Sequence, residues 1–231
     1  MRYVIVLLTL SSFVIEGCSE KVATEPEQAR SENQLPSFAK EKEKCPPNVK
    51  YAGKKYSTIQ IGGQCWMREN LDVGLRADGI QDQSDNGVIE KYSFDDNPSN
   101  SETYGGLYQW NEAMEYTTAE GMQGICPPGW HVPTLADFQT LVTAANYDGN
   151  ALKAVGQGSG MGAGTNTTGF SALLAGVRAD GFSGLGSATG FWCSTESGTD
   201  AYFLSISGNS GALFLHATSK NVGFSVRCIK D

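Results

Sequence analysis

The densest group of side chains that could bind a cation lies in an acid-rich segment. It holds eight carboxylates, which are Asp72, Asp78, Asp82, Asp85, Glu90, Asp95, Asp96 and Glu102. Hard cations such as Ca²⁺ prefer these oxygens. However, the stretch DQSDNG lacks the D-x-D-x-D-G spacing of a calcium-binding loop. We therefore expect a solvated loop and no cofactor, with a calcium site as the alternative.

Three adjacent side chains in this segment, Asp95, Asp96 and Asn97, are the candidates for polar contacts to a ligand. They lie at a predicted turn, and loops held on a rigid sheet commonly supply the residues that bind ligands. A second long loop is predicted over Gly156–Gly169, which is glycine-rich and expected to be flexible. The alternative for the three residues is a solvated turn without a partner.

A cysteine near the start of the chain has the surroundings of a lipidation site. Arg2 precedes a mostly apolar run from Tyr3 to Ile15. This run is shorter than the ~20 apolar residues that a membrane-spanning helix needs. The run leads into Ile15-Glu16-Gly17-Cys18, which is similar to a bacterial lipobox although Glu16 is unusual there. We predict a lipoprotein signal peptide over residues 1–17 and a lipid on Cys18 that anchors the protein to a membrane. An ordinary secretory signal is the alternative.

The segment that follows, residues 18–44, is predicted to be a disordered tether. It is rich in Glu, Lys, Gln and Ser and has too few apolar residues to form a core. Ser19 stands where an Asp would resemble an inner-membrane retention signal. We therefore expect an outer-membrane lipoprotein that faces the periplasm or the cell surface.

Charge and composition exclude several classes of function. The net charge is −8 and no basic face is visible, so nucleic acid is not an expected partner. The sequence contains only two histidines, which excludes HExxH zinc sites and any site with three histidines. G-x-S-x-G, GxxxxGK[ST] and GxGxxG are also missing.

Residues 45–231 read as one α+β domain of short strands with few helices. A helix is predicted from Thr134 to about Asn146, with Thr134 and Asp137 as its capping residues. A shorter helix is predicted over Asn111–Tyr116, with Asn111 as its N-cap. The predicted strands are Lys54–Ile61, Gln64–Leu71, Val88–Phe94, Tyr104–Trp110, Phe170–Val177, Gly190–Ser194, Ala201–Ile206, Ala212–Ala217 and Val222–Ile229.

Aromatic residues are expected to build the core of this domain. Its tryptophans are Trp66, Trp110, Trp130 and Trp192. Buried aromatic side chains contribute large apolar areas, so we predict core packing for all four and not stacking against sugars. His131 lies beside Trp130, and we expect it to be a structural hydrogen-bonding group and not a catalytic base.

Seven segments of this domain occur in a characteristic order. They are GGQCWMRENLDVG, EKYSFDDNPSN, YGGLYQWNEAMEY, ICPPGWHVPT, FSALLAGVR, GFWCSTE and VGFSVRCIKD. This ordered set resembles the Fibrobacter succinogenes major paralogous domain, over about Tyr51 to Asp231. The resemblance implies a fold like those of formylglycine-generating enzymes and C-type lectins: a curved antiparallel sheet with flanking helices and long loops. In such a fold the two long loops are expected to gather on one side of the domain and form the contact surface. The resemblance also implies an envelope protein that is secreted or lipid-anchored, and it implies no particular activity.

Apart from Cys18 the chain has five cysteines, so at least one thiol stays free or pairs elsewhere. An exported protein can keep disulfides. The resemblance favours a disulfide between Cys126 and Cys228. Cys45 and Cys65 are the next plausible pair, and Cys193 lies in an apolar strand where we expect a buried free thiol.

Two departures from related sequences affect these expectations. Formylglycine-generating enzymes use two closely spaced cysteines to bind copper, and GFSVRC resembles their ending. Here Cys228 has no other cysteine within the preceding thirty residues, so we expect no oxidase activity. Many members of the family also carry a cysteine pair where this chain has Ser93 and Ser101, which implies a looser loop here.

Together these features predict a lipid-anchored cell-envelope protein that acts as a non-catalytic binding or adhesion module. Its expected partners are the membrane, through the lipid, and an extracellular glycan or protein. One alternative is an enzyme, for example one that acts on glycans, using the same loop surface. The other is a structural component of the envelope or of a surface appendage.

Overall fold

The computed structural model describes residues 45–231. The predicted signal peptide (1–17), the lipidation site Cys18 and the predicted tether (18–44) lie outside the described residues. The described residues, 45–231, form one compact unit that contains three hydrophobic clusters and two disulfides. Because the core and the covalent links all lie within this unit, we expect it to fold on its own.

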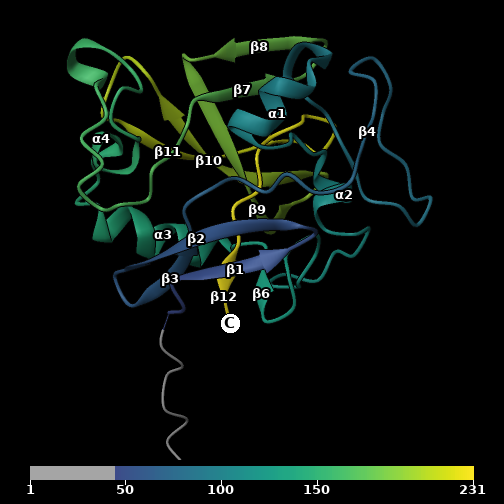
Figure 1. Cartoon of the computed structure of the whole chain (residues 1–231), viewed down its shortest axis with the longest axis horizontal. Coiled ribbons are helices and arrows are strands. Elements are labelled where there is room, and N and C mark those ends of the chain that lie inside the picture. The colour runs from purple at the N-terminus through teal and green to yellow at the C-terminus, as the bar shows by residue number, and fades with distance from the viewer. Residues whose placement is uncertain (1–44) are drawn as a thin grey trace, which may run out of the picture. The chain divides into compact units, whose positions relative to one another are not determined.

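Two five-stranded sheets form most of the domain (Figure 1). The first has the order β1-β2-β3-β12-β6, from β1 (Asn48–Tyr51), β2 (Lys54–Ile61), β3 (Gln64–Met67), β12 (Ile229–Lys230) and β6 (Trp130–His131). The second has the order β11-β10-β9-β7-β8, from β11 (Leu213–Ser219), β10 (Asp200–Ser207), β9 (Ala188–Ser197), β7 (Ala175–Arg178) and β8 (Phe182–Leu185). β7 pairs with β9 in parallel, as does β4 (Leu75–Arg76) with β5 (Glu90–Lys91).

Few helices accompany the sheets, which confirms the α+β class. They are α1 (Pro98–Tyr104), α2 (Trp110–Ala113), α3 (Leu135–Ala144) and α4 (Gly149–Leu152), with 3₁₀ turns η1 (Phe94–Asp96) and η2 (Gly160–Gly162). The resemblance implied one antiparallel sheet, whereas the structure has two sheets and includes parallel pairs. The main helix is α3, and its predicted capping box is confirmed: Thr134 accepts from the backbone of Asp137, and the Asp137 side chain accepts from the backbone of Thr134.

Two of the predicted strands are wrong, and Phe170–Val177 is wrong over most of its length because β7 begins only at Ala175. Tyr104–Trp110 forms the end of α1, two isolated bridges at Leu107 and Tyr108 and the start of α2, because Gly105 has a φ of 84° that interrupts an extended run. Most of Val222–Ile229 forms only single bridges, for example between Phe224 and Tyr108, before the chain enters β12. The predicted N-cap Asn111 is also wrong, since α2 already begins at Trp110.

The four tryptophans lie in the core, as the sequence predicts. None is more than 4% exposed. The buried indole N–H of Trp110 donates to the Cys193 carbonyl at 2.7 Å, and that of Trp192 donates to the Tyr108 carbonyl at 2.7 Å. These bonds satisfy the polar edge of each ring, so the rings fix the positions of the segments around them.

One disulfide links the start of the domain to β3, and the other links the segment before β6 to the residue before β12. Cys126 is bonded to Cys228 and Cys45 to Cys65, and Cys193 is a buried free cysteine. The C-terminal segment that carries Cys228 pairs with Tyr108, with Phe191 of β9 and with Trp66 of β3. It therefore links the two sheets.

The glycine-rich loop 156–169 is folded back on itself, which differs from the flexible loop expected. Gly164 N–H donates to the Gln157 carbonyl at 2.8 Å, and Ser159 N–H donates to the Gly208 carbonyl at 2.9 Å. A Cβ on Gly162 would lie 2.3 Å from the Gly208 carbonyl oxygen. Glycine is therefore needed here for close packing of two backbones, not for mobility.

A pair of buried serines in the acid-rich segment gives a test of local stability. Ser93 Oγ has no hydrogen-bond partner among the described residues, whereas Ser101 Oγ donates to the Pro98 carbonyl at 3.0 Å. A buried polar group without a partner lowers stability by about 1–3 kcal/mol. Ser93→Ala is therefore expected to raise the free energy of unfolding by about 1 kcal/mol, and Ser101→Ala to lower it by a similar amount. Urea denaturation of both variants tests this, and an equal loss in both would contradict it.

Candidate functional site

The main candidate site is a pocket of about 610 Å³ at one end of the second sheet. We call it the Arg178 pocket. Three stretches that lie far apart in the sequence form its wall, together with Asp96 from η1. Its lining residues are Gly79, Ile80, Asp82, Asp96, Arg178, Ala179, Asp180, Gly181, Phe182, Ser219, Asn221 and Val222.

Arg178 holds the segments of this pocket together. Its guanidinium is largely buried and lies 4.7 Å from the centre of the Tyr92 ring. Nε donates to the Gly79 carbonyl at 2.9 Å, Nη2 to the Gln81 carbonyl at 3.2 Å and Nη1 to the Asn221 carbonyl at 3.3 Å. Because these carbonyls belong to two different loops, one side chain from the end of β7 fixes the shape of the pocket wall.

The rim of the Arg178 pocket carries three carboxylates. Asp82 is 67% exposed in its side chain, and its Oδ1 accepts from Arg178 Nη1 at 3.2 Å and from Gln109 Nε2 at 2.8 Å. Asp180 is exposed at the turn between β7 and β8. Asp96 Oδ1 accepts from the Gly79 N–H at 2.8 Å. Asp82 therefore contacts Arg178, whereas Asp96 Oδ1 also accepts from Arg76 Nη1 at 3.3 Å, and the three carboxylates supply hydrogen-bond acceptors at the rim.

Apolar groups complete the pocket. Ile80 is 88% exposed, and Phe182 contacts Phe94 with ring centres 5.3 Å apart. A Cβ on Gly79 would lie 2.4 Å from the Phe182 ring, so Gly79 lets the loop approach the aromatic side chain closely. The pocket thus offers hydrogen-bond acceptors beside an apolar face.

The structure separates the three residues that the sequence predicts as ligand contacts. Asp96 lines the Arg178 pocket. Asn97 is the N-cap of α1, where its side chain accepts from the Ser99 N–H at 3.1 Å. Asp95 is exposed and has a φ of 54°. Only one of the three therefore reaches the pocket, and Asn97 has a structural contact.

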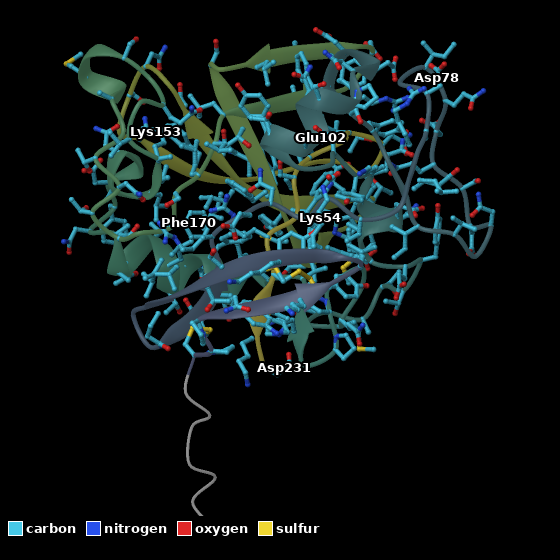
Figure 2. All side chains as sticks on the ribbon, viewed as in Figure 1. Lys54, Asp78, Glu102, Lys153, Phe170 and Asp231 are labelled. Carbon is cyan, nitrogen blue, oxygen red and sulfur yellow. A yellow bond between two sulfur atoms is a disulfide. The ribbon has the colours of Figure 1, made fainter. Side chains whose placement is uncertain are left out.

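The two long loops do not gather on one side, so that expectation is wrong. In Figure 1 the loop around β4 lies at the right and the region around α4 at the left. Figure 2 shows the same separation between Asp78, on the acid-rich segment, and Lys153, just before the glycine-rich loop. The glycine-rich loop lines a different pocket of about 380 Å³ with Gly186, Ser187, Gly208 and Asn209.

Sequence reasoning missed Arg178, Asp180 and Asn221 as pocket residues. Arg178 is part of the FSALLAGVR segment, where an arginine that ends an apolar run is a usable signal for a buried, fully bonded side chain. Asp82 was one of eight similar carboxylates, and the sequence alone gave no reason to choose it. Its position became evident only when β7 placed Arg178 beside it.

The described residues contain no group of three His, Cys, Asp or Glu side chains placed to hold a metal ion. They also include no helix long and apolar enough to cross a membrane. The thiol of Cys193 is buried, and burial raises its pKa. Cys228 is bonded to Cys126 and is not a free thiol.

His131 bridges α3 and the C-terminal residue, as expected of a structural histidine. Its Nδ1 lies 2.7 Å from Asp231 Oδ1 and its Nε2 lies 3.3 Å from Asp137 Oδ2. Burial lowers the pKa of His131, but hydrogen bonds to Asp137 and Asp231 outweigh it and raise the pKa above 6.5. Burial raises the pKa of Asp137, but hydrogen bonds from His131 and Thr134 outweigh this effect and lower the pKa to about 2.

These shifts predict how stability depends on pH. Because the folded pKa of His131 lies above 6.5, its contribution is complete below pH 6.5 and is lost as pH rises through the folded value. The contribution of Asp137 is present above pH 3.8 and is lost as pH falls toward 2. His131→Gln should therefore reduce the fall in the free energy of unfolding between pH 6 and 9, measured by urea denaturation. An unchanged pH dependence would contradict this account.

Comparison with known proteins identifies the family. The family model of the Fibrobacter succinogenes major domain matches residues 59–230. No curated protein and no solved structure matches the chain. The matched range covers most of the chain, includes the whole second sheet and contains every residue of the Arg178 pocket. The chain therefore belongs to the Fibrobacter succinogenes major domain family.

Proposed function

We propose that this chain is a lipid-anchored outer-membrane protein whose domain binds an extracellular glycan or protein without turning it over. The Arg178 pocket is the observation that carries the proposal. Its volume of about 610 Å³ falls within the range of about 300–1,000 Å³ typical of small-molecule sites. It has room for one or two sugar rings or for one side chain of a protein partner.

The chemistry of the rim suits ligands that donate hydrogen bonds. Carboxylates accept from hydroxyl groups and from amines, and Asp82, Asp96 and Asp180 supply them on three sides of the pocket. Phe182 and Ile80 provide an apolar surface beside them. Asp82 and Asp96 already have hydrogen-bond partners in the protein, so a ligand meets acceptors whose positions are fixed in advance.

We also propose that the fold is related to those of C-type lectins and formylglycine-generating enzymes. The support is the pair of curved sheets, the few short helices and the long irregular segments between them (Figure 1). The non-catalytic proposal rests on the same pocket. Its main competitor is an enzyme that acts on glycans with two of the rim carboxylates, and the experiments below separate the two.

Retention on an array of glycans and peptides tests the proposal. The probe is residues 45–231, with and without Ca²⁺, as parent and as Asp82→Asn/Asp180→Asn. The matched control is Asp85→Asn/Glu115→Gln, which removes the same charge from exposed residues outside the Arg178 pocket. The pocket variant should lose the retained spots while the control keeps them, at unchanged melting temperature. Loss in the control alone, or retention by the pocket variant, would overturn the proposal.

A further inference from the structure

The outer edge of the second sheet is long and uncharged. β11 is the edge strand next to β10, and its seven residues read Leu-Phe-Leu-His-Ala-Thr-Ser. None of them is buried, and Phe214 is 50% exposed. Apart from the pairing with β10, this strand makes one backbone hydrogen bond within the described residues, in which the Ser219 carbonyl accepts from the Val222 N–H. The outward N–H and C=O groups of Leu213–Thr218 thus have no partner in the described part of the chain.

The other edges of the two five-stranded sheets are protected in ways that β11 is not. β8 has four residues and contains Gly184 at a φ of 78°. β1 has four residues and includes the exposed Lys50, and β6 has only two residues. Short strands, glycine irregularities and lysines are the usual protection against edge-to-edge pairing. β11 has no charged residue and no proline.

The residues that flank β11 also leave the edge uncharged. Ser207 to Ala212 contains no charged side chain. Lys220 follows the strand. Its ammonium group pairs with Glu196 and lies 4.2 Å from the centre of the Trp110 ring, so its charge is held by those two residues and not at the open edge of β11. A charged partner therefore finds no electrostatic complement at this edge, while a second copy of the same edge meets no local repulsion.

We propose that β11 pairs antiparallel with β11 of a second copy of this chain, joining two five-stranded sheets into one of ten strands. The proposal does not depend on ligand binding at the Arg178 pocket. The twofold axis passes through His216, so that His216 faces its own equivalent and Phe214 faces Thr218 of the second copy. Phe214 and His216 are already stacked, with ring centres 5.2 Å apart, and this aromatic pair continues across the seam on the exposed face.

Cysteine cross-linking tests the contact and its register on the full-length protein in membranes and on residues 45–231 in solution. Directly opposed residues of antiparallel strands have Cα atoms about 4.5–5.5 Å apart, which suits a disulfide. Under copper–phenanthroline in air, His216→Cys should give a disulfide-linked dimer. Phe214→Cys and Thr218→Cys should each stay monomeric alone and cross-link when mixed. The parent should not cross-link, since its free Cys193 is buried.

Edge-blocking variants test the same contact without cysteines. Ala217→Lys places a charge on an exposed position of β11, and Ser183→Lys places the same charge on an exposed position of β8. In sedimentation velocity of residues 45–231 over a concentration series, the parent and Ser183→Lys should dimerise. Added salt should strengthen the dimer because each copy carries 11 basic and 18 acidic side chains, a net charge of −7. Ala217→Lys should remain monomeric. A parent that is monomeric throughout, or Phe214→Cys cross-linking alone as well as His216→Cys, would overturn the proposal.

Discussion

Arg227→Ala is expected to lower the free energy of unfolding by about 3–5 kcal/mol. The side chain is 1% exposed and has no carboxylate among its hydrogen-bond partners. Its guanidinium packs against the rings of Phe170 and Phe191, at 4.3 and 5.1 Å from their centres. Burial lowers its pKa. Removing this side chain leaves a large cavity and strips two buried oxygens of their donors.

Those two oxygens explain why the effect extends beyond the cavity. Arg227 donates from Nη2 to Asn70 Oδ1 at 2.5 Å and from Nη1 to the Phe170 carbonyl. Asn70 in turn donates to the Tyr104 carbonyl at 2.8 Å and to Ser225 Oγ at 3.2 Å. The network therefore connects the segment after β3, the end of α1 and the C-terminal segment.

Urea denaturation of three variants separates the contributions. Arg227→Met fills much of the cavity without a charge, so it should cost about 1–3 kcal/mol, mainly for the unpaired oxygens. Arg68→Ala is the matched control, because Arg68 also donates to a carbonyl and a hydroxyl but is only half-buried. It should cost less than about 1 kcal/mol. Equal losses in Arg227→Ala and Arg68→Ala would contradict the proposed role of the buried network.

The second large effect concerns the disulfide between Cys126 and Cys228. It closes a loop with a sequence separation of 102, and both cysteines are fully buried. In the chain-entropy model its removal costs about 4.7 kcal/mol, because the unfolded chain regains the freedom that the link removed. The pair of substitutions Cys126→Ala and Cys228→Ala should therefore lower the midpoint of urea unfolding markedly.

The other disulfide serves as the control. Cys45 and Cys65 are 20 residues apart, which gives about 3.3 kcal/mol in the same model. Removing Cys126–Cys228 should thus cost about 1.5 kcal/mol more than removing Cys45–Cys65. A larger loss for Cys45–Cys65 would show that native contacts, and not loop length, determine the contribution of each link.

Regular local patterns were the part of the fold that could be predicted. Lys54–Ile61 has strand alternation along its whole length and forms β2 with the predicted bounds. Thr134 and Asp137 predict the capping box of α3 because both partners lie within one helical turn. Tyr104–Trp110 failed because its aromatic residues favour a strand while Gly105, at a φ of 84°, breaks it, and tertiary contacts decide between the two.

The candidate site could be predicted only in part, for a different reason. Asp95, Asp96 and Asn97 are adjacent in the sequence, but Asn97 caps α1 while Asp95 and Asp96 lie in η1. Their side chains therefore make different contacts. The Arg178 pocket instead combines residues 43 to 139 positions apart in the sequence, such as Asp82, Arg178 and Asn221. No local sequence pattern predicts that these residues lie close together, because their proximity depends on the pairing of β7 with its neighbours in the second sheet.

Chemical-shift mapping with a ligand retained on the array tests the central claim most directly. The ligand is titrated into ¹⁵N-labelled residues 45–231, and the ligand signals are recorded over the same hours. Binding at the Arg178 pocket predicts amide shifts that cluster at Gly79–Asp82 and at Arg178–Phe182, with the ligand spectrum unchanged after release. Shifts centred on the glycine-rich loop 156–169, or new ligand signals from a reaction product, would contradict the account of a non-catalytic binding module.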